Sequence, residues 1–262
     1  MPIDPALKQA LLSCEQAFSQ QLDHQKPLIL RLDGRAFSHW QRGLQAPFDD
    51  NLATLMQRTT AHLVKETHAQ CGYTCNDEIS LILLNTQPDQ NYAFGGKVHK
   101  WNALTAAEAS VYFQIEKQTL PLPDVHKRTP VLFDCRVFQV SDLETASQYL
   151  LWREEAAIRN SVATLARHHL KTISLHNKNT PELLQLLSDQ GIDWNTLAAH
   201  HQRGSVFRRV SLEVPFTPQE RLNLPDKHHA KRNPNATYTR RKIVHLDLPP
   251  LHTLEDPKNV LF

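Results

Sequence analysis

Two short segments, far apart in the sequence, carry residues that could hold metal ions at an active site. Asp33 and Gly34 end an apolar run, and Asp77 and Glu78 lie between two extended runs, where a hairpin tip is predicted. If the fold brings Asp33 and Asp77 together, their carboxylates repel one another unless a cation lies between them. Magnesium suits such a place, because it binds one or two carboxylates together with substrate phosphates. Two such ions can hold both the attacking and the leaving oxygen of a phosphoryl transfer.

Basic residues near these acids could neutralise a bound triphosphate. Arg35 directly follows Gly34, and Lys97 and Lys100 lie at the start of a predicted helix, where anions are favoured. Gly34 would also let a ligand approach the backbone, so that its carbonyl could serve as a metal ligand. Taken alone, each feature has a simpler reading, since Asp-Gly pairs are common in turns and lysines are common at solvated helix ends.

The elements that must position these residues follow from the apolar pattern. It predicts strands over 27–32, 72–77, 78–84 and 131–138, with helices over 50–67 and 97–118. This order is the split βαβ arrangement of ferredoxin-like domains. Such a unit is an α+β architecture with its helices on one face of the sheet. In this topology the first strand and the hairpin are neighbours, so Asp33 and Asp77 are expected to share one small space.

The remaining residues are expected to form a different kind of structure. Helices are predicted over 4–21 and 142–170, another helix starts at Thr180-Pro181 and ends at Gly191, and a strand covers 205–214. We predict a boundary near residue 141. Residues 1–141 would form the catalytic domain, and residues 142–262 would form a helical and basic part packed on it.

Composition argues against a membrane protein, a secreted protein and a small disulfide or zinc scaffold. It does not decide whether the protein binds a nucleic acid. The 262 residues carry 29 Lys and Arg against 27 Asp and Glu, a net charge of only +2. No run approaches the roughly 18 apolar residues of a membrane helix, and the N-terminus has no signal-peptide pattern, so the cytoplasm is the expected location. The four cysteines form neither a disulfide framework nor a paired zinc motif.

Positive charge gathers toward the C-terminus, which would suit an RNA partner through phosphate contacts. The residues in this cluster are Lys227, His228, His229, Lys231, Arg232, Arg240, Arg241 and Lys242. On its own, such a cluster is more often a solvated surface. The histidine pairs His168-His169 and His200-His201 have no carboxylate or cysteine at ligand spacing, so we assign them no metal role.

Several motifs, in this order, resemble the tRNA-His guanylyltransferase superfamily. They are Arg31-Leu32-Asp33-Gly34-Arg35-Ala36-Phe37, Asn76-Asp77-Glu78-Ile79-Ser80, Phe94-Gly95-Gly96-Lys97-Val98-His99-Lys100, Phe133-Asp134-Cys135-Arg136-Val137 and Tyr149-Leu150-Leu151-Trp152-Arg153. The likeness covers roughly residues 25–170 and extends weakly to Gly191-Ile192-Asp193-Trp194-Asn195 and Gln202-Arg203-Gly204. No single motif is decisive, but five in order are quite specific.

The resemblance implies a polymerase-palm enzyme that adds nucleotides to the 5′ end of tRNA in the 3′-to-5′ direction. ATP would first activate the 5′-phosphate, and the 3′-hydroxyl of an incoming nucleotide, usually GTP, would then attack it. Two Mg²⁺ ions would be held by Asp33, Gly34 and Asp77, with Glu78 as a further catalytic acid. The residues implied to bind nucleotide are Asp33, Gly34, Arg35, Ala36, Phe37, Ser38, Asn76, Asp77, Lys97 and Lys100. Arg153, Asn160, Lys231, Arg232, Arg240 and Arg241 are expected to contact RNA.

Two departures from the family pattern bear on which branch of the family, and which tRNA substrate, is expected. The His-Ile-Asn-Asn motif of eukaryotic members is replaced by Ile158-Arg159-Asn160-Ser161, which resembles the guanylyltransferase-like branch of bacteria and archaea. That branch repairs 5′-truncated tRNAs against the opposite strand and is less tied to tRNA-His. The family pattern has a basic residue directly before Pro47, where this sequence has Ala46, so one of the expected phosphate contacts is missing.

Two other functions remain open at this point. A nucleotide cyclase would use the same acids on the same fold, although it needs no basic RNA surface. A non-catalytic tRNA-binding protein would not need all three acids. The resemblance also implies a homo-oligomer, and specifically a tetramer.

Overall fold

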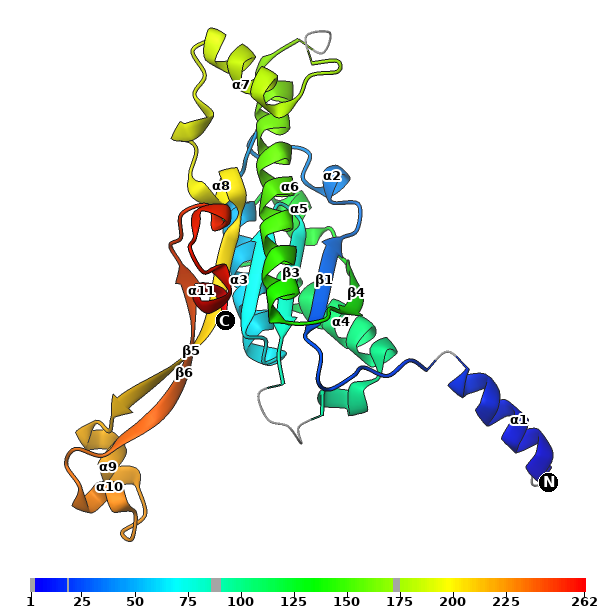
Figure 1. Ribbon diagram of the computed structural model, residues 1–262, viewed down its shortest axis with the longest axis vertical. Helices are drawn as coiled ribbons and strands as arrows, with labels where there is room; N and C mark the ends of the chain where they lie inside the picture. The colour runs from blue at the N-terminus through cyan, green and yellow to red at the C-terminus, as the bar shows by residue number, and fades with distance from the viewer. Residues whose placement is uncertain (1–2, 18, 86–90, 172–174) are drawn as a thin grey trace.

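The computed structural model describes residues 3–17, 19–85, 91–171 and 175–262 (Figure 1). The strands are β1 (Leu28–Gly34), β2 (Cys71–Cys75), β3 (Glu78–Leu83), β4 (Phe133–Gln139), β5 (Ser205–Pro215) and β6 (Thr237–Leu246). The longer helices are α1 (Pro5–Gln16), α3 (Asp50–Glu66), α4 (Val98–Glu116), α6 (Leu143–His169) and α7 (Thr180–Asp189). The shorter ones are α2 (Phe37–Trp40), α5 (Asp124–Arg128), α8 (Ala199–Arg203), α9 (Pro218–Asn223), α10 (His229–Arg232) and α11 (Pro257–Leu261), with 3₁₀ turns η1 (Ala93–Gly96), η3 (Trp194–Thr196) and η4 (Leu251–Thr253).

One antiparallel sheet organises the molecule, in the order β4-β1-β3-β2-β5-β6. Its first four strands have the order of the split βαβ unit, which confirms the α+β, ferredoxin-like expectation. Strands β5 and β6 extend the same sheet beyond β2. The C-terminal half therefore joins the sheet that carries the candidate acids.

The two faces of the sheet are covered by different helices. Leu28, Leu30 and Leu32 point to the face where α3 and α4 pack, and Ile29 points to the face crossed by α6. Alternate side chains of a strand point to opposite faces, so a continuous apolar run is what a strand covered on both sides needs. Figure 1 shows α6 running across the front of β1 and β3, with α3 and α4 behind the sheet.

The first helix is shorter than the pattern predicts, because it ends at Gln16 rather than at residue 21. Residues 20–22 are instead bound to the turn before α4: the Leu22 N–H donates to the Gly96 carbonyl (2.8 Å), and the Val98 N–H donates to the Gln20 carbonyl (3.0 Å). Helix α1 itself buries no residue. Figure 1 shows it projecting away from the sheet.

Strands β5 and β6 form a ribbon that leaves the body of the molecule (Figure 1). They pair from Val206–Leu246 to Pro215–Thr237, and α9 and α10 lie at the far end. Sequence analysis predicts β5 but neither β6 nor these helices. Within the described ranges, no helix is long and apolar enough to span a membrane.

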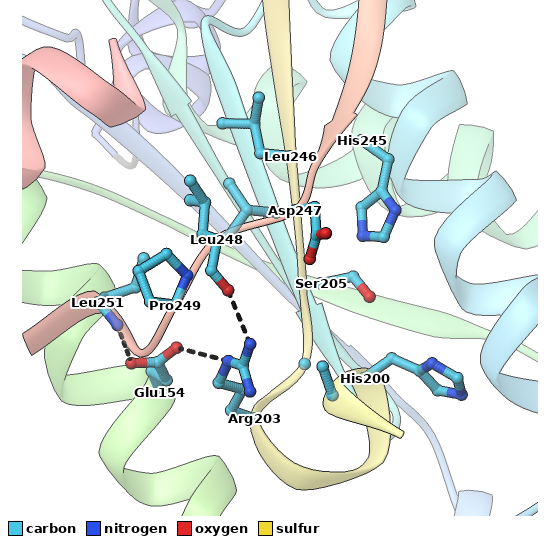
Figure 2. Close-up of a pocket in the computed structure, with 13 residues that line it drawn as sticks. Glu154, His200, Arg203, Ser205, His245, Leu246, Asp247, Leu248, Pro249 and Leu251 are labelled. Atoms are coloured by element: carbon cyan, nitrogen blue, oxygen red, sulfur yellow. Dashed lines mark hydrogen bonds and ion pairs between the residues drawn. The ribbon is translucent and has the colours of Figure 1, made fainter. Parts of the chain in front are cut away.

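A buried carboxyl group joins α6 to the C-terminal segment beside a pocket of about 80 Å³ (Figure 2). Glu154 accepts a hydrogen bond from the Leu251 N–H (2.6 Å), and the Nε of Arg203 lies 3.9 Å from its other oxygen. Burial raises the pKa of Glu154 from 4.5 to about 7, despite the opposing effects of this N–H and of Arg203. Glu154 is therefore easier to protonate in the folded chain than in the unfolded one.

Stability should consequently depend on the charge of Glu154. Because folding raises its pKa, the Glu154 carboxyl contributes its full stabilisation at pH values below its unfolded pKa near 4.5. This contribution is lost as the pH rises through about 7. We expect Glu154→Gln, which cannot ionise, to gain up to about 2 kcal/mol over the wild type between mildly acidic and mildly alkaline pH. Urea unfolding across this range measures the difference. Glu155→Gln, at the exposed neighbouring position, is the control, and parallel pH profiles for wild type and Glu154→Gln would contradict the prediction.

Candidate active site

Strand pairing brings the predicted acidic residues to one end of the sheet. Asp33 on β1 is in register with Glu78 on β3, and on its other side with Asp134 on β4. The Gly34 N–H donates to the Asp77 carbonyl across 3.1 Å, which ties the end of β1 to the hairpin tip. Asp33 and Asp77, 44 positions apart in the sequence, are thus neighbours in space.

The local sequence explains both bends that carry these acids. Asn76 and Asp77 form a two-residue turn between the paired residues Cys75 and Glu78, and Asn76 takes a left-handed φ of 53°, which asparagine tolerates well. At the other bend, a Cβ on Gly34 would overlap the ring of Phe37. Phe37 is buried, so the Asp33-Gly34 turn is folded directly onto the core.

The electrostatics of the pair are those of a cation site. Burial, together with the charges of Asp33 and Glu78, raises the pKa of Asp77 to about 6, against an opposing hydrogen bond from its own backbone and the charge of Arg31. Burial also raises the pKa of Asp33, as do Glu78 and Asp134. Among the residues that the structure describes, neither carboxylate forms an ion pair with a basic side chain. Their chemistry therefore fits a hard divalent cation, which needs oxygen ligands and relieves this repulsion.

Glu78 lies beside Asp33 and Asp77 but, unlike them, forms ion pairs with basic side chains. Its two oxygens form ion pairs with Arg31 of β1 and Arg153 of α6, whose side chains are 18% and 11% exposed. Arg153, predicted to contact RNA, is instead engaged inside the fold, with its guanidinium also 5.0 Å from the centre of the Trp152 ring. The structure thus places Glu78 as a link between the sheet and α6, next to Asp33.

A pocket of about 560 Å³ opens beside the acids. Its walls come from the segment after β1, the start of α3, the β2–β3 turn, α6 and α8. Among the predicted site residues, Ser38, Asn76, Asp77 and Asn160 line it. This volume is in the range of pockets that hold small ligands. The pocket also uses residues from both halves of the chain.

The structure does not bring Lys97 and Lys100 to this site within one chain. Lys97 pairs with Gln21, before the start of β1, whereas the hydroxyl of Ser110 accepts from the N–H of Phe133, the partner of Gly34. Helix α4 therefore begins at the opposite end of the sheet and reaches the level of Gly34 only three turns later. Both lysines are exposed at that far end. Contrary to the expectation, they therefore do not lie next to a nucleotide bound at Asp33 of the same chain.

The other predicted residues lie in three settings. Arg35 and Ala36 are exposed at the turn after β1, and Ala36 takes a left-handed φ of 56°. Phe37 is buried in the aromatic core, so only its backbone could face a nucleotide. Among the predicted RNA contacts, Arg232, Arg240 and Arg241 are exposed on the arm formed by β5, β6, α9 and α10, and Lys231 is paired with Asp226 (2.8 Å).

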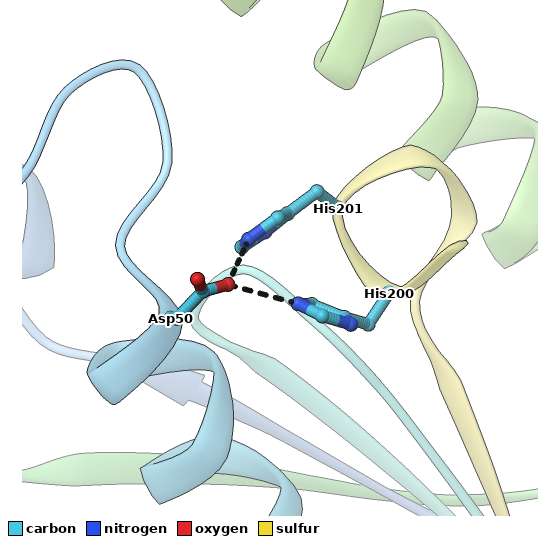
Figure 3. A group of neighbouring side chains, drawn as sticks. All are labelled: Asp50, His200 and His201. Carbon is cyan, nitrogen blue, oxygen red and sulfur yellow. Dashed lines mark hydrogen bonds and ion pairs between the residues drawn. The ribbon is translucent and has the colours of Figure 1, made fainter. Parts of the chain in front are cut away.

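Sequence reasoning misses part of the pocket wall. His200 and His201 of α8 line the pocket and both approach the carboxylate of Asp50 at the start of α3 (Figure 3). Sequence spacing gives these histidines no carboxylate neighbour, but the fold supplies Asp50. Asp50 lies 150 positions earlier in the chain, so no local spacing signals the contact.

Two neighbouring carboxylates at adjacent ends of an antiparallel sheet, beside a pocket, can hold the two metal ions that phosphoryl-transfer enzymes use. Comparison with known proteins gives the family. The family model described as "tRNAHis guanylyltransferase" (Thg1) matches residues 9–141, about half of the chain. The chain belongs to this family, whose members are nucleotidyltransferases acting on tRNA.

Similar proteins agree with this assignment. A bacterial tRNA(His) guanylyltransferase (Thg1)-like protein in complex with ATP is 25% identical, with a TM-score of 0.71 over 77% of this chain and 88% of that one. The fold also matches such a protein in complex with GTP (21% identity, TM-score 0.69, 94% of both chains). A third match is the Saccharomyces cerevisiae tRNA(His) guanylyltransferase (20%, TM-score 0.62, 73% and 90%). The uncharacterized protein R259 of Acanthamoeba polyphaga mimivirus is 24% identical over 221 residues, 76% of each chain.

Proposed function

We propose that this protein is a magnesium-dependent enzyme that adds nucleotides to the 5′ end of tRNA in the 3′-to-5′ direction, after ATP has activated the 5′-phosphate. The observation that carries the proposal is the pair Asp33–Asp77. These carboxylates are held together by the fold and form no ion pair with a basic side chain of the described residues, and Asp77 lines a pocket large enough for a nucleotide.

Each residue near the pair has a distinct task in this proposal. Asp33, the Gly34 carbonyl and Asp77 would hold two Mg²⁺ ions, which when bound neutralise the charge of the phosphates and of the reacting oxygens. The turn between β1 and α2 positions Asp33 because Phe37 is packed against Gly34. Arg31 and Arg153 form ion pairs with Glu78 and hold it beside Asp33, where its charge adds to the repulsion that bound cations would relieve.

The nucleotide substrates follow from the pocket and the relatives. The neighbours bound to ATP and GTP support nucleoside triphosphates as ligands of the same fold. Ile158 stands where the motif tied to tRNA-His in eukaryotic members has its histidine, and Asn160, two residues further along the same motif, lies on the pocket wall with Asp77. We therefore favour repair of 5′-truncated tRNA over addition confined to tRNA-His.

A single extension assay tests this function. The full chain is given Mg²⁺, ATP, GTP and 5′-monophosphorylated tRNA that lacks its first nucleotide, with tRNA-His and other tRNAs compared. We expect products one nucleotide longer with both kinds of tRNA. Cyclic nucleotide formed without RNA would favour the cyclase, and tight tRNA binding without any extension would favour a binding protein.

The arm formed by β5, β6, α9 and α10 is proposed to hold the tRNA. Arg240 and Arg241 are adjacent on β6, so their side chains project from opposite faces of a ribbon that stands out from the body. Both are exposed, as is Arg232 at the tip. Such cations bind RNA phosphates whatever the base sequence, which suits an enzyme that recognises the shape and the end of an RNA.

Removing the arm charges should weaken tRNA binding mainly at low salt. For Arg240→Ala/Arg241→Ala, we expect at least about tenfold weaker binding and a log–log salt slope smaller by about 2, one per lost phosphate contact. Fluorescence anisotropy of labelled tRNA at several salt concentrations measures both. Lys8→Ala/Lys26→Ala is the matched control, because both lysines are exposed and lie outside the arm, on α1 and just before β1. An unchanged salt slope in the arm variant would contradict this placement of the RNA.

We also propose that the chain forms a homo-oligomer, as the family resemblance implies. Supporting this, Leu104, Val111 and Ile115 make an exposed apolar stripe along α4, and they are 47%, 58% and 63% exposed. An uncovered stripe of this kind is typical of a protein–protein contact.

A further inference from the structure

Two histidines and an aspartate outside the acidic pair converge on one point (Figure 3). The Nε2 of His201 lies 2.8 Å from Oδ1 of Asp50, and the Nε2 of His200 lies 3.3 Å from the same oxygen. The three potential ligand atoms are all within 4.8 Å of one another. Each ring thus directs its Nε2 atom to the same place, which is the arrangement that a shared ion requires.

The backbone that carries the histidines is firmly held. The side-chain amide of Gln202, between the histidines and Gly204, donates to the carbonyls of Asn195 and Leu197 at 3.1 and 2.8 Å. Gly204 ends α8 with a φ of 85°, and a Cβ there would lie 2.5 Å from the Thr74 carbonyl oxygen. Helix α8 is therefore fixed against β2, and its side chains are positioned before any ligand arrives.

The partner groups are also constrained. The ring of His201 stacks on Phe48, with centroids 5.0 Å apart, and its side chain is only 13% exposed. Asp50 is the first residue of α3, directly after Asp49, whose carboxylate caps the helix by accepting from the Leu52 N–H at 2.8 Å. A site built on such supported side chains loses little conformational freedom when it binds an ion.

The donor set selects the kind of ion. Imidazole nitrogen and carboxylate oxygen are the ligands of zinc and similar transition metals, whereas magnesium prefers oxygen alone. Bonds of about 2.0 Å in a tetrahedral site place ligand atoms about 3.3 Å apart, close to the separations seen here. A plain ion pair explains the convergence less well, because Asp50 is 77% exposed and a surface pair contributes little.

We propose that Asp50, His200 and His201 bind one zinc-like transition-metal ion, with the fourth position open toward the pocket. His200 and His201 line the pocket that Asp77 also lines, so the ion would lie at the wall of the same pocket. This site differs from the oxygen-rich pair Asp33–Asp77 in its donors, its elements and its metal. It does not depend on the proposed nucleotidyl transfer.

The test measures metal binding directly on the full chain without an affinity tag. Co²⁺ is titrated in excess Mg²⁺, which occupies oxygen-only sites, and the visible absorption of four-coordinate Co²⁺ is followed; Zn²⁺ then displaces it. We expect one site in the wild type, and binding at least about 100-fold weaker in Asp50→Asn and in His200→Gln/His201→Gln. His168→Gln/His169→Gln removes another adjacent histidine pair, at the end of α6, and should bind as the wild type does.

Thermal unfolding gives a second measurement that does not involve activity. Zn²⁺ should raise the melting temperature of the wild type and of the His168→Gln/His169→Gln control, but not that of Asp50→Asn. Because Asp50 is exposed, its replacement leaves the core intact. Equal affinity for Co²⁺ in the wild type and Asp50→Asn, or the absence of Co²⁺ binding by the wild type, would overturn the proposal.

Discussion

Replacing Asp77 by asparagine should abolish nucleotide addition while leaving the protein at least as stable as the wild type. The variant keeps the size of the side chain but removes a negative charge that the proposed metal ions would require. A loss of several kcal/mol of transition-state stabilisation corresponds to a rate at least about 10³-fold lower. Stability should hold because burial and the neighbouring Asp33 make the charge of Asp77 unfavourable, as its raised pKa of about 6 indicates.

The extension assay and urea unfolding, run on the same preparations near neutral pH, separate the two effects. Asp124→Asn is the matched control, because Asp124 is an 83% exposed acid that pairs only weakly with Arg128 across 3.6 Å. It should keep full activity. An Asp77→Asn enzyme with wild-type turnover would remove the basis of the proposed function.

Replacing Glu78 by alanine should both destabilise the fold and impair catalysis. Arg31 and Arg153 would lose their shared counterion in a largely buried place, which costs about 2–3 kcal/mol. Arg31 lies on the same face of β1 as Asp33, two residues away, so it would be free to pair with Asp33. Because that pairing competes with the metal, we expect activity to fall about 100-fold as well.

Two further variants distinguish this explanation from general damage. Glu116→Ala breaks another Glu–Arg pair, to Arg58, whose side chain is 48% exposed, and should change stability by less than about 1 kcal/mol. Arg31→Met together with Glu78→Ala should recover part of the stability, since one unpaired charge is then removed. Additive losses in the double variant would show that Arg31 and Glu78 are not coupled.

The meeting of Asp33 and Asp77 could be predicted because it depends only on strand order. Once β1 and the β2–β3 hairpin are recognised from apolar runs and a turn pair, antiparallel pairing places their ends together. The misplacement of Lys97 has an equally simple cause. From Glu78, strand β3 carries the chain about 20 Å away from the hairpin tip before α4 begins. Closeness in sequence to the hairpin therefore does not mean closeness to its tip.

Other features left no periodic signal to read. Strand β6 is exposed along much of its length, so its residues do not alternate between apolar and polar as a half-buried strand does. The contact of His200 and His201 with Asp50 depends on how α8 packs beside α3, which only the folded chain determines. For the same reason, Arg153 gave no sign that Glu78 would engage it.

Strand β5 has a mechanical consequence for the enzyme. It is one continuous strand from Ser205, beside Thr74 of β2, to Pro215 far out on the arm. Thr74 is three positions before Asp77. If RNA binds the arm as proposed, a force on the tip would act along β5, which is paired with the residues that lead into the turn carrying Asp77, so that substrate binding and the alignment of this carboxylate would be coupled.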